Sequence, residues 1–320
     1  MHKMKIALIG PGMMPIPPTA WGAVEILIWD FRNALIKNGH EVDIINTKDL
    51  NEILEKAESK EYDIVHLHYD AYAHLMKHIS CPNKFVSSHY PFLENPEPQY
   101  TWIHSDCRDS ECHIIISSDG IKKAFVERGC KPDQVSVLAN GVDLGLYEFK
   151  EDESSLRHAD KSIYLAKIEP RKRQTLVQGK GFDIHFAGGL HDTDFKPLDG
   201  EYIGELTKDQ IYSGLTDYGN MILLSTGEAH SLSCIEGLAA GLGLVISEFA
   251  TANLDLDKPF ITVIPEDKIH DTDYIGELIK ENREVSVSMR SEIRQYAVDN
   301  FDWPNIIKKY EKILNDNKSD

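Results

Sequence analysis

Short apolar runs alternate with helical segments along the whole chain, and this alternation constrains the fold more than any other feature. Residues 4–9 form an apolar run, residues 22–37 carry apolar side chains at helical spacing, and residues 41–45 form a second apolar run. A strand, a helix and a further strand in this order favour a parallel sheet flanked by helices. The pattern repeats, with further strands expected at 63–69, 84–90, 113–118, 162–168, 182–189, 201–206, 220–226, 243–247 and 260–265, and helices at 51–60, 71–78, 119–129, 172–178, 208–214, 232–240 and 272–281.

The chain has 320 residues, which is enough for two domains of ordinary size. Residues 150–161 are charged and have almost no apolar content, as expected of a linker. We therefore predict two α/β domains, at 1–155 and 156–300. A last apolar stripe at helical spacing predicts a C-terminal helix over 301–316, and this helix needs a surface on which to pack.

Charge and cysteine content exclude several classes of protein. The chain has 52 acidic and 34 basic residues, and its net charge of −18 argues against binding to nucleic acid or firm attachment to an anionic membrane. Its five scattered cysteines form no disulfide framework and fit a reducing compartment. The first residues run directly into a strand pattern without a signal-peptide core, and no apolar run approaches the roughly 20 residues that span a bilayer. We therefore expect a soluble cytoplasmic protein.

The segment 225–247 carries the clearest indication of a binding site. It predicts a loop after a strand, a helix that begins near Ser231, a stop at Gly241 and then another strand. The N–H groups of a first helical turn have no partner within the helix, and the positive end of the helix dipole lies beside them. Ser231 and Ser233 are residue types that suit a helix start. The sequence therefore predicts an anion site here, suited to a phosphate.

Two glutamates flank the predicted anion site. Glu228 precedes the helix, and Glu236 lies in its second turn with its side chain leaning back toward the helix N-terminus. A carboxylate at Glu236 can accept two hydrogen bonds from a ribose diol, while Glu228 would face the other end of the same ligand. This arrangement suits a nucleotide diphosphate sugar. The alternative is that Glu236 only caps or pairs on a helix surface.

The spacing of Glu228, seven residues and Glu236, followed by GLAAGLGLVIS, resembles the signature of retaining glycosyltransferases with the GT-B fold, above all glycosyltransferase family four. Other segments are similar to that family in the same order along the chain. They are its glycine-rich loop (GPGMMPIPPTAWGAVE, 10–25), the motif that closes its first domain (NGVD, 140–143), the start of its nucleotide-binding domain (LAKIEPRKRQ, 165–174) and its C-terminal helix (FDWPNIIKKYEKIL, 301–314).

The resemblance implies an α/β, GT-B architecture of two Rossmann-like, doubly wound domains that face a central cleft. The first domain, 1–155, would bind the acceptor. The second domain, 156–300, would bind the nucleotide sugar. The C-terminal helix 301–316 would cross back onto the first domain.

The resemblance also assigns roles in donor binding. Lys167 and Lys172 would clamp the donor diphosphate, with Lys167 standing where the family has an arginine fork. Glu236 would hold the ribose, and Glu228 would orient the transferred sugar. The backbone amides of Ser231, Leu232 and Ser233 would stabilise the departing diphosphate.

In the first domain the resemblance implies contacts from the glycine-rich loop and from one histidine. Gly10 and Gly12 would allow close approach of a ligand, and Gly22 matches a glycine near the diphosphate and the acceptor. His89 matches a histidine that lines the sugar and acceptor pocket, so the catalytic residues would be Glu228, His89 and Lys172. Trp21 would lie in the acceptor loop, within a shallow apolar patch with Met13, Met14 and Ile16 that could receive a lipid-linked substrate at a membrane surface.

The implied activity is transfer of a hexose, with retention, from a nucleotide diphosphate sugar to a glycan, a lipid-linked acceptor or another hydroxyl. A UDP-sugar is favoured and a GDP-sugar is next, with no cofactor and no metal ion required. The alternatives are a sugar-nucleotide epimerase and a non-catalytic binding protein. Two weaker patterns are also present. Gly10 and Gly12 form half of a dinucleotide-binding fingerprint, but Pro15 stands where its third glycine belongs. Loose metal-ligand spacings occur at Cys107 and Cys112 with His104 and His113, and at Asp255 and Asp257.

Overall fold

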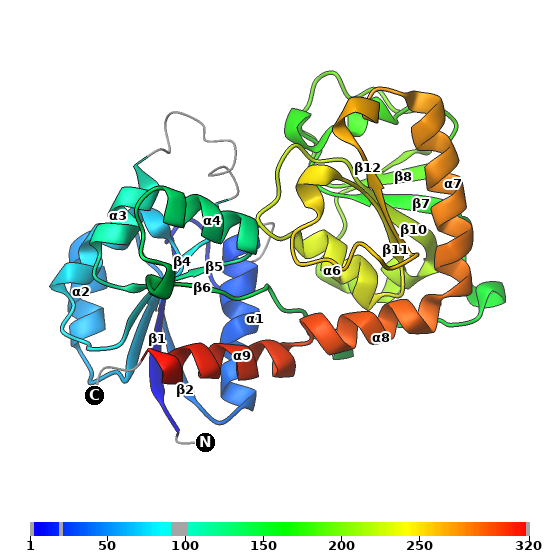
Figure 1. The fold of residues 1–320 in the computed structure, drawn as a ribbon. Helices are drawn as coiled ribbons and strands as arrows, with labels where there is room; N and C mark the ends of the chain where they lie inside the picture. The colour runs from blue at the N-terminus through cyan, green and yellow to red at the C-terminus, as the bar shows by residue number, and fades with distance from the viewer. Residues whose placement is uncertain (1–2, 19–21, 91–101, 318–320) are drawn as a thin grey trace. The chain divides into compact units, whose positions relative to one another are not determined.

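The computed structural model describes residues 3–18, 22–90 and 102–317, and they form two compact α/β units (Figure 1). The first unit comprises Met1–Gly141 and Trp303–Asp320, and the second comprises Val142–Asp302. Each unit contains one six-stranded sheet. The predicted α/β class is therefore confirmed.

The sheet of the first unit has the strand order β2-β1-β3-β4-β5-β6, and every neighbouring pair is parallel. All four residues of β3 are buried, which explains why the strands read as apolar runs. N-cap residues fix where two of the helices begin. The side chains of Asp49 and Ser118 accept hydrogen bonds from first-turn amides of α2 and α4. The elements are β1 Lys5–Ile9, α1 Ala23–Lys37, β2 Glu41–Ile45, α2 Leu50–Glu58, β3 Ile64–Leu67, the 3₁₀ helix Asp70–His78, β4 Lys84–Ser88, α3 Ile103–Asp109, β5 His113–Ile116, α4 Asp119–Glu127 and β6 Val135–Val137.

The C-terminal helix α9 (Trp303–Asp316) packs beside α1 of the first unit (Figure 1). The ring of Phe31 lies 5.6 Å from that of Trp303 and 4.8 Å from that of Tyr310. Two buried polar contacts fix the helix further. The Tyr310 hydroxyl is 2.9 Å from His66 Nδ1, and Glu311 Oε1 is 2.9 Å from His40 Nε2. The helix therefore completes the core of a unit whose other residues lie more than 160 positions earlier in the chain.

Gly141, in the NGVD segment, lies against the indole of Trp303. A Cβ at residue 141 would lie 2.5 Å from Trp303 Cε3, closer than real Cβ contacts come. We expect Gly141→Ala to lower the free energy of unfolding by about 1–3 kcal/mol, because the buried indole must move. Urea unfolding checks this value. Gly145→Ala is the matched control, since its Cβ would meet only the Asp143 side chain at 3.2 Å, and an equal loss in both variants would contradict the explanation.

The sheet of the second unit has the strand order β12-β11-β10-β7-β8-β9 and is also parallel throughout. The central strand β10 is buried along its whole length. The elements are β7 His158–Leu165, β8 Ile184–Ala187, β9 Tyr202–Gly204, α5 Lys208–Gly214, β10 Tyr218–Leu223, α6 Leu232–Ala239, β11 Gly243–Ser247, β12 Ile261–Ile264, α7 Thr272–Ser288 and α8 Arg290–Phe301.

The structure differs from the sequence prediction in the first part of the second unit. The helix expected at 172–178 is replaced by two short 3₁₀ turns, Pro170–Lys172 and Gln174–Leu176, with Arg173 between them in the left-handed region at φ 55°. A residue in that conformation ends a helix, so the segment forms turns. The predicted linker also contains the start of β7, where His158 pairs with Tyr218.

The contacts divide the chain after Gly141, whereas the sequence placed the boundary at 155. Residues after 141 belong to the second unit because their backbone is bonded to it. The amide of Glu148 donates to the Tyr212 carbonyl at 2.9 Å, and the amide of Lys150 donates to Thr216 Oγ1 at 3.0 Å. Low apolar content at 150–161 therefore marks an exposed connection within the second unit.

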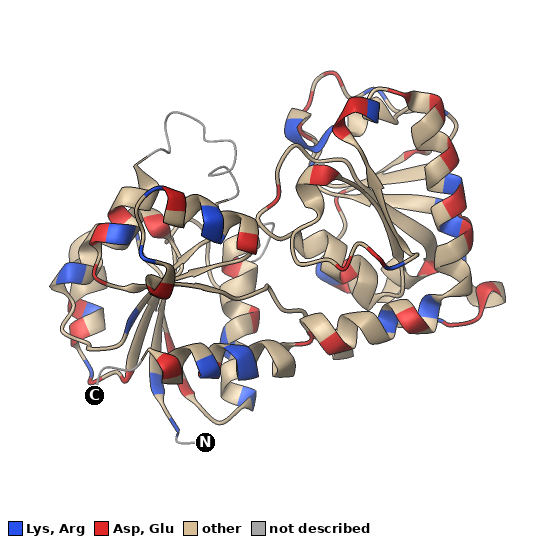
Figure 2. Cartoon of the chain, viewed as in Figure 1, with Lys and Arg blue, Asp and Glu red and all other residues tan. Residues whose placement is uncertain are grey.

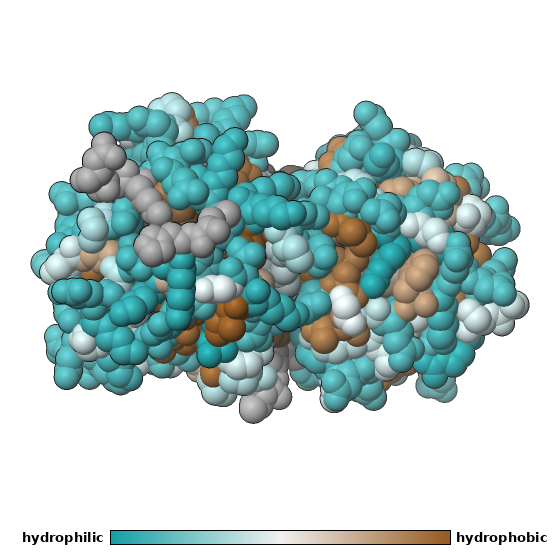
Figure 3. Space-filling view, turned by 90° about the horizontal axis from the view of Figure 1, so that it is seen from below, coloured by the Kyte–Doolittle hydropathy of each residue, from teal (hydrophilic) through white to brown (hydrophobic). Residues whose placement is uncertain are grey.

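Basic and acidic residues are both scattered along the helices and loops of the two units (Figure 2). On the face shown in Figure 3 most of the surface is hydrophilic, and apolar residues gather in a few small areas. Within the described ranges, every helix is too short or too polar to cross a membrane.

Candidate functional site

Glu228 lies in the loop between β10 and α6, where its amide donates to the Phe249 carbonyl at 3.0 Å. Its carboxylate Oε1 accepts a hydrogen bond from Lys172 Nζ and lies 3.3 Å from an Arg171 nitrogen. The side chains of Glu228 and Lys172 are each 12% exposed. Burial raises the pKa of Glu228, but attraction to Lys172 and Arg171 outweighs it and holds this pKa below the ordinary value. The structure thus brings together two predicted residues 56 positions apart as an ionised pair.

Arg171 is a part of this cluster that the sequence analysis did not assign. Its guanidinium donates to the Gly227 carbonyl at 2.6 Å and to Glu169 Oε1 at 3.0 Å, and its own carbonyl accepts from the Thr226 amide at 2.9 Å. These bonds tie the turn that carries Lys172 to the loop that carries Glu228. One signal in the sequence could have indicated this role, since Arg171 directly precedes Lys172, a predicted phosphate ligand.

Helix α6 begins where the sequence placed it. Ser231 is its N-cap, and the Ser231 hydroxyl accepts from the Cys234 amide at 3.2 Å. In the part of the chain that the structure describes, the amides of Leu232 and Ser233 meet no protein acceptor. The first turn of α6 therefore presents two N–H donors that an anion can use.

Glu236 lies one turn further along α6 and is buried. Its Oε1 accepts a hydrogen bond from the Tyr147 hydroxyl at 2.9 Å and from Lys208 Nζ at 2.6 Å. Tyr147 and Lys208 were not predicted as site residues, because they lie in a turn after the NGVD segment and at the start of α5, where the sequence carries no motif. Glu236 is therefore held by an aromatic hydroxyl and an ammonium group from two other elements.

Lys167 and Arg173 lie before and after Lys172 in the sequence, but their surroundings differ. The Lys167 side chain is half exposed, and its Nζ lies 3.4 Å from Glu169 Oε2. Arg173 points elsewhere and forms two hydrogen bonds with Glu266, at 2.9 and 2.5 Å. Lys167 is thus available to an anionic ligand, whereas Arg173 serves a structural ion pair.

In the first unit, the predicted glycines are required by the fold itself. Gly12 has a φ of +69°, and its amide donates to Asn46 Oδ1 at 2.8 Å. A Cβ at Gly10 would lie 2.7 Å from the same oxygen. Gly22 is the N-cap of α1. Trp21 lies outside the described residues.

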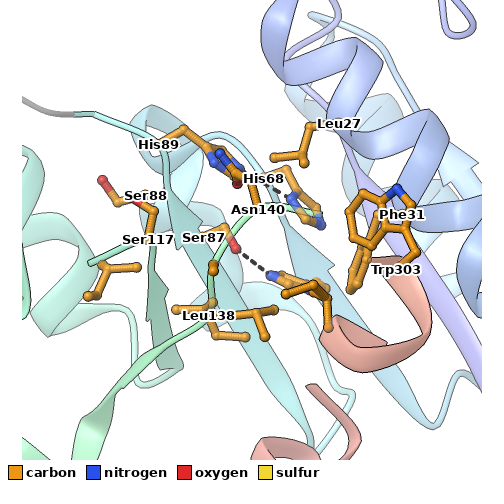
Figure 4. A pocket seen from close by; sticks show the side chains of 15 residues that line it. Leu27, Phe31, His68, Ser87, Ser88, His89, Ser117, Leu138, Asn140 and Trp303 are labelled. Atoms are coloured by element: carbon orange, nitrogen blue, oxygen red, sulfur yellow. Dashed lines mark hydrogen bonds between the residues drawn. The ribbon is translucent and has the colours of Figure 1, made fainter. Parts of the chain in front are cut away.

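His89 follows β4 and stacks on His68, which follows β3 (Figure 4). His68 Nδ1 and His89 Nε2 are 3.3 Å apart, so one ring donates a hydrogen bond to the other. Both rings line a small cavity of about 30 Å³, room for about one water molecule, together with Ser88, Asn140 and Trp303. His68 was not predicted from the sequence. The cavity lies at the carboxyl end of the parallel strands, where α/β folds bind ligands.

The buried histidines give stability a defined pH dependence. Burial lowers the pKa of His89 to about 4 and that of His66 to about 3, and holds the pKa of His68 well below 6.5. These rings stay neutral in the folded protein but take up protons near pH 6.5 in the unfolded chain, so unfolding binds protons between about pH 6.5 and 4. The free energy of unfolding is therefore expected to fall as pH falls through this window. Asp70 opposes part of the effect, since burial raises its pKa to about 6.

Urea unfolding at pH 7, 6 and 5 measures this dependence. His68→Gln is expected to make the slope shallower, because it removes one group whose protonation differs between the two states. His270→Gln, at an exposed surface histidine, is the control and is expected to leave the slope unchanged. Equal slopes in the parent and in His68→Gln would contradict the explanation.

The weaker patterns of the sequence are placed as follows. Cys107 and Cys112 are buried with free thiols. Asp255 and Asp257 lie in the loop between β11 and β12, as expected. Among the described residues, His, Cys, Asp and Glu form no group of three or more that could hold a metal ion.

Comparison with known proteins places this arrangement among solved structures. No protein-family model matches the chain, and the search of curated proteins finds no match. Many solved structures are similar to the chain, and three examples are similar over nearly their whole length. HepE from Anabaena in complex with UDP-glucose has a TM-score of 0.74 at 13% identity, covering 98% of this chain and 99% of that one.

Sucrose-phosphate synthase from Thermosynechococcus elongatus has a TM-score of 0.76 at 14% identity, covering 98% of each chain. AviGT4, a glycosyltransferase involved in avilamycin A biosynthesis, has a TM-score of 0.72 at 15% identity, covering 98% of this chain and 97% of that one. The two parallel six-stranded sheets with their helices match these structures over nearly the whole chain. The chain therefore has the GT-B fold of these glycosyltransferases.

Proposed function

We propose that this protein is a retaining glycosyltransferase that moves a hexose from a UDP-sugar to a hydroxyl group of a glycan or lipid-linked acceptor. The observation that carries the proposal is the second unit's cluster of Glu228, Lys172 and the start of α6, with Glu236 one turn along that helix. The similar HepE structure holds UDP-glucose. A GDP-sugar is the next candidate donor.

Charge neutralisation would drive the departure of the diphosphate. Lys172 and Lys167 supply positive charge. The amides of Leu232 and Ser233 supply hydrogen bonds at the N-terminus of α6, which is the positive end of the helix dipole. Donors fixed in advance where negative charge develops are an effective source of rate acceleration. The Ser231 amide, at the N-cap, is the third predicted donor.

The acceptor hydroxyl would attack on the face from which the diphosphate leaves, so configuration is retained. A phosphate oxygen of the departing group would take the hydroxyl proton, and the ionised Glu228 would orient the sugar through its hydroxyls. In the first unit, His89 would line the acceptor pocket in its neutral form, because burial lowers its pKa to about 4. Met13, which is 54% exposed, would contribute to contact with a lipid-linked acceptor.

A thermal-shift panel followed by a transfer assay tests the proposal. UDP, GDP and their glucose and galactose conjugates are each added, and a ligand at 100 times its Kd raises stability by about 2.7 kcal/mol. Release of UDP that requires an added glycan acceptor supports transfer. Interconversion of the sugar without an acceptor supports an epimerase, and binding without turnover supports a non-catalytic protein, so either result overturns the proposal.

We further propose that transfer needs no metal ion, because protein cations and helix amides supply the positive charge. Addition of EDTA is expected to leave the transfer rate unchanged. The measurement is the initial rate with and without EDTA, and with Mg²⁺ restored as a control. A loss of rate that Mg²⁺ recovers would contradict this part of the proposal.

A further inference from the structure

The carboxylate of Glu236 has one oxygen engaged inside the protein and one oxygen left for a ligand. The Tyr147 hydroxyl and Lys208 Nζ both donate to Oε1, at 2.9 and 2.6 Å. Within the ranges that the structure describes, Oε2 accepts no hydrogen bond. The Glu236 side chain is 10% exposed, so this second oxygen is the part of the group that a ligand can reach.

The two donors are themselves fixed by a third side chain, Tyr212. The rings of Tyr147 and Tyr212 meet edge to face at 5.0 Å, and Lys208 Nζ lies 5.9 Å from the Tyr212 ring centroid. Lys208 and Tyr212 are four residues apart on α5, so they lie on the same face of that helix. Tyr147, Lys208 and Tyr212 therefore hold the Glu236 carboxylate in one orientation.

This orientation limits what Glu236 can recognise. A vicinal diol that donates both protons side by side needs both carboxylate oxygens, as a bidentate guanidinium does. With both lone pairs of Oε1 engaged, a diol cannot bond side by side across the two oxygens, and one hydroxyl is left to bond to Oε2 in the plane of the carboxylate. The Lys208 charge would also offset the carboxylate's repulsion of a diphosphate bound at the start of α6, which lies four residues, or about 6 Å, back along the helix axis.

We propose that Tyr147 and Lys208 are positioning residues that set Glu236 to receive a single ribose hydroxyl of the nucleotide donor through Oε2. This inference rests on the proposed function, since it concerns the ribose of the proposed donor. Tyr147 and Lys208 would thus determine which ribose hydroxyl is bound, although neither side chain has to contact the donor.

Calorimetric titration of the whole protein with UDP, 2′-deoxy-UDP and 3′-deoxy-UDP tests the first part. One deoxy analogue is expected to bind about 10-fold more weakly than UDP or worse, since a hydrogen bond to a charged group is lost. The other analogue is expected to bind within 2-fold of UDP. Two equal losses, or no loss in either analogue, would overturn the inference. GDP and its two deoxy analogues form a parallel series.

Variants test the positioning role. Tyr147→Phe and Lys208→Met are each expected to reduce the affinity ratio between the two deoxy analogues at least 3-fold, because Oε1 becomes available to the second hydroxyl. Lys208→Arg is expected to restore the ratio, and Lys280→Met, at an exposed lysine of α7, is expected to leave it unchanged. A purely structural role would weaken all three nucleotides equally, so an unchanged ratio in both variants would refute the positioning role.

The outcomes separate this inference from the proposed function. If neither UDP nor GDP binds the parent protein, the proposed function fails and the inference fails with it. If UDP binds and sugar is transferred while the ratio stays the same in both variants, only the inference fails.

Discussion

Replacing Lys172 with methionine is expected to lower kcat for sugar transfer by at least about 100-fold. The ammonium group would be the nearest protein charge to the departing diphosphate, and removal of one such preorganised donor typically costs this much. The same change leaves Glu228 largely buried with Arg171 as its remaining cation, at 3.3 Å. Loss of one partner from a buried ion pair is expected to lower the free energy of unfolding by about 3 kcal/mol.

Steady-state kinetics and urea unfolding measure the two effects of Lys172→Met separately. The double variant Lys172→Met with Glu228→Gln is the control for stability, because it also removes the carboxylate that has lost its partner, and stability is expected to recover in it. Activity is compared in Lys172→Met itself, because Glu228→Gln alone is expected to lower kcat. A kcat near the parent value, measured at a temperature where Lys172→Met is fully folded, would show that Lys172 acts only through folding.

Glu228→Gln is expected to lower kcat about 100-fold while affinity for free UDP stays the same or rises. Glutamine keeps the size of the side chain but loses the charge that would orient the sugar hydroxyls, and small errors in placement cost rate factors of this order. Affinity for the nucleotide is preserved because Lys172, no longer paired with a carboxylate, becomes fully available to phosphate.

Single-turnover transfer and calorimetric titration with UDP separate these two effects of Glu228→Gln. Glu266→Gln is the matched control, since Glu266 pairs with Arg173 outside the site, and it is expected to keep kcat near the parent value. Full activity in Glu228→Gln would exclude the proposed orienting role. A large loss of UDP affinity would instead show that Glu228 contributes to binding of the nucleotide.

The sequence predicted the architecture well because buried parallel strands and capped helices leave local patterns. The apolar run at 220–226 corresponds to β10, and Ser231 is the N-cap of α6 as predicted. The segment 172–178 was wrong as a helix because a left-handed residue, Arg173, interrupts it, and no local pattern shows a single backbone angle. Helix α8 was missed because its apolar periodicity is weak. It begins instead with the buried Arg290, whose guanidinium donates to four backbone carbonyls.

The candidate site was predicted in its motif residues but not in their partners. Glu228 and Glu236 follow from spacing along one loop and helix. Arg171, Tyr147 and Lys208 contact them from other elements, and contacts between distant segments leave no trace in a single sequence. The His68–His89 pair is of the same kind, because parallel strands β3 and β4 bring together two residues 21 positions apart.

The return of α9 to the first unit sets an order of events during synthesis. Residues 142–302 are continuous in the chain, so the second unit can close its core as soon as they have left the ribosome. The first unit cannot do so, because part of its core is formed by α9. Phe31, His40 and His66 reach their partners only after Trp303, Tyr310 and Glu311 have been synthesised. The amino-terminal half of this protein is therefore the last to mature, and a nascent chain halted before residue 303 would present an unfinished apolar face to chaperones.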